Sequence, residues 1–160
     1  MSQTDDPTSQ IDDVVPLEQQ LCFSVYSAAH AFNAAYKPLL EPFSLTYPQY
    51  LVLLALWQKD GVSVKDIGAR LHLDSGTLTP LLKRLQASGY VRRGRNPADE
   101  RQLLVELTPE GQALRFEVAK VRMGLVCSLG VTEPAIQILR GEIDVMTGLL
   151  RKMVETPVTA

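Results

Sequence analysis

The sequence predicts a mainly α-helical protein with one small β-hairpin, and three observations lead to this fold class. Apolar residues recur at helical spacing in several long segments, which are separated by Gly, Pro or polar residues. Residues 103–107 instead alternate apolar and polar side chains, as a strand does. With 160 residues, 46% of them hydrophobic, the chain is long enough for one domain with its own core.

The N-terminal part divides into an acidic arm and a long helix. Residues 1–14 are polar and acidic without apolar periodicity, so we expect a disordered arm. Residues 17–36 are rich in apolar side chains and contain no Gly or Pro, which predicts a helix that ends before Lys37 and Pro38. That helix is apolar on most sides. It needs more than one neighbour to cover it, and a second copy of the chain is a natural source.

Capping signals predict the second helix and the last two. Thr46 and Gln49 have the T-x-x-Q spacing of a capping box, which starts a helix reaching about Trp57. Thr-Pro-Glu and Thr-Glu-Pro sequences start two long amphipathic helices, over residues 108–129 and 132–154.

Two shorter helices are predicted between these segments. Ser63 can cap the first, and Asp74 or Ser75 can cap the second, which runs to Ser88 and is closed by Gly89. Only about three residues separate the two helices, which is the geometry of a helix-turn-helix. We therefore expect the second short helix to lie in a major groove of DNA.

A β-hairpin follows the helix-turn-helix. Residues 90–93 and 103–107 predict two short strands, joined by a polar loop over residues 94–102 that gives the hairpin a basic tip. Helix, turn, helix, strand, charged loop and strand together define a winged helix-turn-helix domain, here residues 46–107. The flanking segments, 15–45 and 108–156, are expected to form a helical dimerisation region, because two half-sites are usually read by a symmetric dimer.

The distribution of charge favours a nucleic-acid partner more than its sum does. The net charge is −2, but residues 1–20 hold five acids and no base, whereas residues 61–107 hold eight bases and five acids. A basic segment of this kind is typical of DNA-binding surfaces. A solvated surface without a partner explains the charge alone equally well.

Residues 89–111 have the sequence G-Y-V-R-R-G-R-N-P-A-D-E-R-Q-L-L-V-E-L-T-P-E-G. This sequence resembles the wing of the MarR family of bacterial regulators. The resemblance extends from Leu21 to the last helix, and it implies a homodimeric repressor that binds double-stranded DNA. It also implies that Arg101 enters the minor groove, while Asp99 forms an ion pair with Arg101 or Arg95; an ordinary surface pair is the alternative. Hydroxyl and cationic side chains on the second short helix are candidates for contacts with bases and phosphates. They are Ser75, Thr77, Thr79, Lys83 and Arg84.

Within this family the first helix resembles the organic hydroperoxide sensors of the OhrR group, two-cysteine subclass. The matching stretches are L-C-F-S-V-Y-S-A-A-H-A-F-N-A-A-Y-K-P-L-L and L-T-Y-P-Q-Y-L-V-L-L-A-L-W. The resemblance implies that Cys22 reacts with organic hydroperoxide and that Tyr36 and Tyr47 donate hydrogen bonds to its thiolate, which favours the charged form. It further implies that Cys127, of the other subunit, resolves the oxidised Cys22 as a disulfide. For each cysteine an inert apolar role in a core is the alternative.

Helix geometry constrains this candidate site. If residues 17–36 form one straight helix, the 14-residue separation places Tyr36 about 21 Å from Cys22 along the axis. The two side chains then cannot touch within one chain. We predict that Tyr36, and with it Tyr47, reaches Cys22 across the dimer interface.

Two other functions stay open at this point. A regulator of the same fold can respond to a small aromatic ligand without thiol chemistry, and a thiol peroxidase can use Cys22 and Cys127 for turnover, although the basic hairpin disfavours an enzyme. His30 and His72 are isolated, so we expect no metal, cofactor or catalytic triad. The sequence contains neither an apolar run long enough for a membrane span nor a signal-peptide pattern, so we expect a cytoplasmic protein without a membrane partner.

Overall fold

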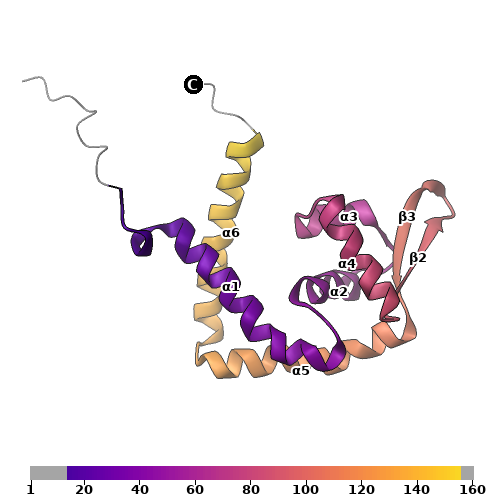
Figure 1. Cartoon of the computed structure of the whole chain (residues 1–160), viewed down its shortest axis with the longest axis horizontal. Helices are drawn as coiled ribbons and strands as arrows, with labels where there is room; N and C mark the ends of the chain where they lie inside the picture. Colours follow the sequence, from indigo (N-terminus) through magenta and orange to yellow (C-terminus); the bar gives the residue numbers. More distant parts are fainter. Residues whose placement is uncertain (1–13, 156–160) are drawn as a thin grey trace, which may run out of the picture. The chain divides into compact units, whose positions relative to one another are not determined.

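The computed structural model describes residues 14–155, which are mainly helical and include one three-stranded antiparallel sheet (Figure 1). The predicted fold class is therefore confirmed. The chain divides after Arg115 into two compact units. The predicted disordered arm lies outside the described residues except for Val14, and the division into a DNA-binding domain and a dimerisation region stays a prediction.

The first long helix begins and ends later than expected. A 3-10 helix, Leu17–Gln19, precedes α1, Leu21–Leu40. The prediction that the helix ends before Pro38 is wrong, because Pro38 lies in its last turn. A proline there removes one backbone hydrogen bond, while the burial of Tyr36 and Leu40, two residues before and two after Pro38, holds the end of the helix in place.

Helix α2, Tyr47–Gln58, begins at the predicted capping box. The Gln49 side-chain oxygen accepts hydrogen bonds from the Thr46 backbone N–H at 2.8 Å and from the Thr46 hydroxyl at 3.0 Å. Beyond this start, α2 is buried along much of its length and supplies Val52, Leu53 and Leu56 to the core. It forms the centre around which the rest of the first unit packs.

The predicted helix-turn-helix is confirmed as α3, Val64–Leu71, and α4, Ser75–Ala87, both of which contact α2. The Ser63 hydroxyl accepts from the Asp66 backbone N–H, and the Asp74 carboxylate accepts from the Thr77 backbone N–H. These caps satisfy backbone donors that the first turn of a helix leaves unpaired. The turn between the helices is therefore defined at both ends.

The sheet has the order β1-β3-β2, formed by Val62–Ser63, Asp99–Leu107 and Val91–Asn96. Strand β1 is missing from the sequence prediction because two residues are too few to show alternation. The hairpin strands are longer than predicted, and only residues 97 and 98 separate them. The added strand residues are polar because they project beyond the core, so apolar alternation could not reveal them.

The remaining helices are α5, Pro109–Leu129, and α6, Glu133–Glu155. The Thr108 hydroxyl accepts from the Gly111 backbone N–H at 3.0 Å. Thr108 therefore caps the start of α5, in agreement with the prediction that a helix begins here. Among the described residues no helix is both long enough and apolar enough to span a membrane.

Candidate DNA interface and thiol site

Helix α4 has one face in the core and one face available to a partner. Its buried side chains are Leu78, Leu82 and Leu85. Ser75, Thr79 and Lys83 recur every four residues and therefore share a different face of the helix. Ser75, Lys83 and Arg84 are exposed, and Thr79 is half-buried with its hydroxyl donating to the Ser75 carbonyl at 2.6 Å.

Thr77 takes part in the cap of the same helix. Its backbone N–H and its hydroxyl donate to the two carboxylate oxygens of Asp74, at 2.8 and 2.9 Å. The Thr77 hydrogen bonds, led by the one from its backbone N–H, lower the pKa of Asp74 below the ordinary 3.8. Thr77 thus helps to fix the N-terminal end of α4, the part of a recognition helix that contacts base edges.

The tip of the hairpin differs from the prediction in one interaction. Asp99 accepts from the Arg101 backbone N–H and from the Gln102 side-chain amide, both at 3.1 Å. Within the described part of the chain Asp99 forms no ion pair with Arg95 or Arg101, so the predicted pair is wrong. The tight turn brings the carboxylate next to the backbone of Arg101, and these hydrogen bonds satisfy it there. Arg95 and Arg101 stay exposed.

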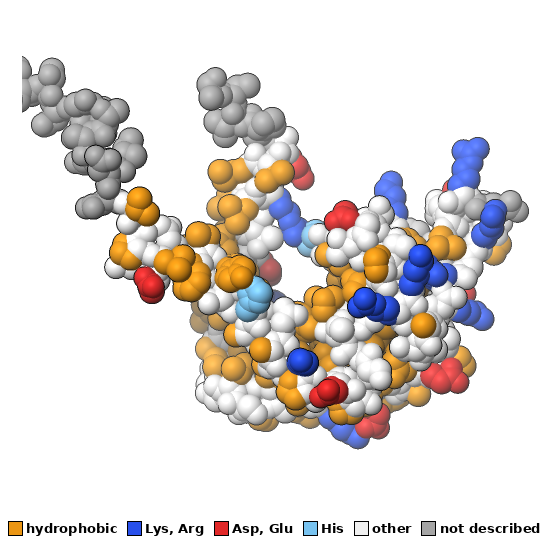
Figure 2. Space-filling view, in the orientation of Figure 1, with side chains coloured by type: hydrophobic (Ala, Val, Ile, Leu, Met, Phe, Trp, Pro, Cys, Tyr) orange, Lys and Arg blue, Asp and Glu red, His pale blue; other side chains and the backbone are white. Residues whose placement is uncertain are grey.

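Cationic side chains gather over α4 and the hairpin, as Figure 2 shows. They come from two consecutive elements that pack together, since α4 contacts β2. A surface of this sign attracts the phosphate backbone of DNA. It is the candidate DNA interface.

Tyr36 and Tyr47, the two predicted thiol-activating residues, lie together. Their ring centroids are 4.8 Å apart, although one residue is on α1 and the other begins α2. Burial and, to a smaller extent, the neighbouring Tyr36 raise the pKa of Tyr47 above 10.0, so its phenol is neutral and a hydrogen-bond donor at neutral pH. The ring centroid of Tyr50 lies 5.5 Å from that of Tyr36. Tyr50 was not among the predicted site residues, although the Y-P-Q-Y spacing was an available signal.

Both cysteines are free thiols on exposed positions of the described chain. Cys22 is in the first turn of α1, and Cys127 is near the end of α5 in the second unit. Because α1 is continuous from Leu21 to Leu40, Tyr36 is about 21 Å along the axis from Cys22. One chain therefore does not bring Cys22 and Tyr36 into contact.

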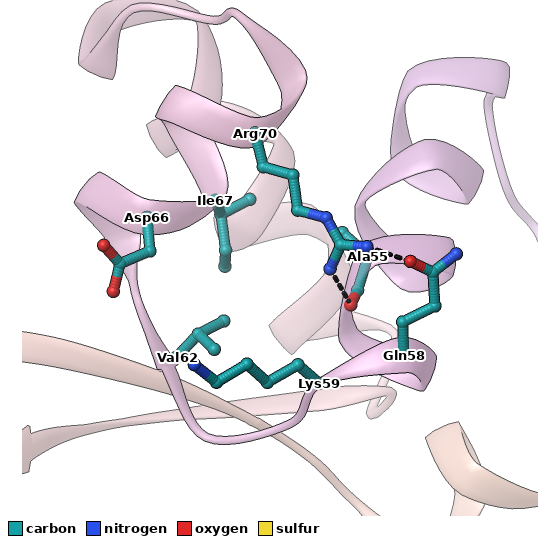
Figure 3. A pocket seen from close by; sticks show the side chains of 7 residues that line it. All are labelled: Ala55, Gln58, Lys59, Val62, Asp66, Ile67 and Arg70. Atoms are coloured by element: carbon teal, nitrogen blue, oxygen red, sulfur yellow. Dashed lines mark hydrogen bonds between the residues drawn. The ribbon is translucent and has the colours of Figure 1, made fainter.

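Two of the cavities in the first unit lie beside α2. One, of about 550 Å³, borders Tyr47 and is lined by residues of α1, of the segment that connects α1 to α2 and of the start of α2, including Asn33, Lys37 and Leu45. The other, of about 560 Å³, lies between α2 and α3 (Figure 3). There Arg70 donates to the Ala55 carbonyl and to the Gln58 side chain, so its guanidinium ties α3 to the end of α2.

The comparisons with known proteins agree with this architecture. The family model of the transcriptional regulator SarA/Rot matches residues 34–117, more than half of the chain. The chain belongs to the MarR family of winged-helix transcriptional regulators, and it is a DNA-binding regulator of the MarR/OhrR kind. The predicted family is thereby confirmed.

One relative is named as a regulator of organic hydroperoxide resistance, and others have names that state no signal. The regulator TtmR of Methylorubrum extorquens is 62% identical over 72% of this chain, and the match spans 56% of the length of TtmR. The organic hydroperoxide resistance regulator of Bacillus subtilis is 48% identical, over 68% of this chain and 74% of its own. The structure of reduced AbfR bound to DNA has a TM-score of 0.74 at 36% identity, covering 86% of this chain and 94% of AbfR. AbfR, from Staphylococcus epidermidis, has also been solved with its disulfide formed and, overoxidised, on DNA.

Proposed function

We propose that this protein is a homodimeric repressor in the cytoplasm that leaves its operator DNA when an organic hydroperoxide oxidises Cys22. One observation supports this most directly: Tyr36 and Tyr47 form a compact pair of phenols, while Cys22 stands exposed on α1, about 21 Å along the helix axis from Tyr36. A second chain, arranged antiparallel along α1, supplies the missing partner. The reactive site then exists only in the dimer.

The oxidation needs two steps. The Cys22 thiolate attacks the terminal oxygen of ROOH, the O–O bond breaks, and the alkoxide takes a proton to leave as ROH, so sulfur is oxidised to sulfenic acid while the peroxide is reduced. Cys127 of the other subunit then attacks that sulfur as a thiolate. An S–S bond forms, the S–O bond breaks, and hydroxide leaves and is protonated to water. Phenols from Tyr36 and Tyr47 favour the thiolate that starts the sequence.

Exposed apolar side chains supply material for the dimer interface. On α1 these are Leu21, Val25, Tyr26 and Phe32, and on α6 they include Ile138, Ile143, Leu149 and Met153. Helices with apolar residues on an outer face bury them against a partner. Both segments flank the winged helix in sequence, as the proposed dimerisation region requires.

Repression and release follow from the spacing of the two winged helices. In the dimer each α4 enters a major groove through Ser75, Thr77, Thr79, Lys83 and Arg84, while each wing presents Arg95, Asp99 and Arg101 beside the adjacent minor groove. A disulfide requires Cα atoms within about 7 Å. A resting separation larger than this means that disulfide formation moves the helices that hold the two α4 elements, which then no longer match successive major grooves.

The test is DNA binding by the wild type, Cys22→Ser and Cys127→Ser proteins, before and after addition of cumene hydroperoxide. We expect all three reduced proteins to bind and only the wild type to be released as a covalent dimer. Cys22→Ser should stay bound, because it lacks the thiol that reacts. Release of Cys22→Ser by the peroxide would refute the proposal, whereas its release by an aromatic ligand alone would favour a ligand-responsive regulator.

A further inference from the structure

A basic groove lies between the helix-turn-helix and the wing. Its volume is about 620 Å³, and its lining includes Lys65 at the start of α3, Thr79 on α4, Arg93 on β2 and Arg101 on β3. Three cations from three elements thus border one cavity. Two of them, Lys65 and Arg93, are not among the DNA-contacting residues of the proposed function.

The register of the hairpin explains why Arg93 belongs to this groove. Arg93 pairs with Val105 and Arg92 pairs with Glu106, so successive residues of β2 point to opposite faces of the sheet. The face of Arg93 contains the buried Val91 and Val105, and Arg93 itself is half-buried. On the other face Arg92 forms an ion pair with Glu106 at 2.9 Å.

The guanidinium of Arg93 is held in position by α4. Its Nε donates to the side-chain oxygen of Gln86 at 2.5 Å, which leaves the two terminal nitrogens without a partner among the described side chains. The one carboxylate on the groove, Asp66, accepts from the Ser63 hydroxyl at 2.8 Å. The groove therefore has a positive charge balance, with a donor that is already oriented.

The geometry of DNA identifies the occupant. One sugar-phosphate strand separates a major groove from the adjacent minor groove. If α4 enters the major groove and Arg101 the neighbouring minor groove, as the proposed function has it, that strand must cross between them. We propose that the groove holds this strand, with Lys65 and Arg93 bound to its phosphates.

Phosphate contacts predict a specific signature. Each lost contact reduces the slope of log affinity against log salt by about 0.9, hence by about 1.8 for a homodimer. Because phosphates carry no sequence information, affinity should fall by the same factor on every duplex. Arg92→Gln is a matched control: it removes the same charge from the neighbouring residue on the opposite face.

The experiment measures fluorescence anisotropy of the reduced full-length chain with two duplexes across a range of KCl. One duplex is selected by this protein from a random library, and the other is an unrelated duplex of equal length. Arg93→Gln and Lys65→Gln should each weaken binding about tenfold on both and flatten the salt slope, while Arg92→Gln stays within about twofold of the wild type.

A salt slope in Arg93→Gln and Lys65→Gln equal to that of Arg92→Gln would overturn the assignment. If circular dichroism shows that Arg93→Gln is unfolded, Lys65→Gln alone decides, since its side chain is exposed. The experiment contains no oxidant, so its outcome is independent of the thiol switch, and the wild-type titration reports DNA binding itself.

Discussion

Gly111 shows how a single residue joins distant parts of the first unit. Its backbone N–H donates to the Thr108 hydroxyl, and its carbonyl accepts from the Trp57 indole at 2.8 Å. A Cβ at this position would lie 2.0 Å from the carbonyl oxygen of Tyr90, a backbone atom. The close approach explains why the first turn of α5 holds a glycine despite its low helix propensity.

Replacing Gly111 by Ala should therefore lower the free energy of unfolding by about 1 to 3 kcal/mol, because backbone must move to make room. Gly94→Ala is the matched control, since a Cβ there has nothing within 4 Å. Urea titrations of both variants provide the measurement. Equal stability of the two would show that the close approach at Gly111 does not constrain the fold.

At the scale of elements, the sequence predicted the helices that begin at a capping residue more closely than α1, whose start and end both lie later than expected. Thr46, Ser63, Asp74 and Thr108 each act as expected, because an N-cap depends on a few consecutive residues. The end of α1 depends instead on burial of Leu40, which outweighs the local effect of Pro38. Strand β1 likewise exists only through its pairing with β3.

The hairpin explains why part of the DNA interface was predicted and part was not. The basic run over residues 92–101 is visible in the sequence, and it led to Arg95 and Arg101. Which arginine faces α4 depends on the register with β3, since a shift of one residue exchanges the faces. Arg93 could therefore be distinguished from Arg92 only in the structure.

The cap of α4 predicts a dependence on pH. Since folding lowers the pKa of Asp74, its carboxylate stabilises the protein above the ordinary pKa of 3.8, and this contribution is lost as the pH falls below that value through the lowered pKa. Melting temperatures measured between neutral and acid pH should thus converge for wild type and Asp74→Ala at the acid end. A constant difference between the two at every pH would contradict this account of the cap.

At the scale of the whole molecule, the sequence of one chain does not determine how two chains assemble. Tyr36 and Tyr47 could be placed together from a resemblance, and the structure brings them within 4.8 Å. In the proposed function, Cys22 meets such a pair only in a second chain. Within one chain, the axial distance from Cys22 to Tyr36 follows from the helix rise alone. That distance is the reason for proposing a site shared between two chains.

A charged residue on the apolar face of α6 should disrupt the proposed assembly. Leu149 is 59% exposed, so Leu149→Glu leaves the isolated chain folded but places a charge in the dimer interface. We expect sedimentation to show a monomer that has also lost its affinity for DNA and the peroxide reactivity of Cys22. Gln137→Glu, an exposed polar position on the same helix, is the control. A dimeric Leu149→Glu would exclude this face from the interface.

The most direct test of the shared thiol site uses a heterodimer. One chain contains Cys22→Ser with its own tyrosines, and the other contains Cys22 with Tyr36→Phe and Tyr47→Phe. The measurement is the rate at which cumene hydroperoxide oxidises the single remaining Cys22. If the tyrosines act across the interface, that rate equals the wild-type rate per thiol. A rate as slow as that of the Tyr36→Phe, Tyr47→Phe homodimer would contradict the account.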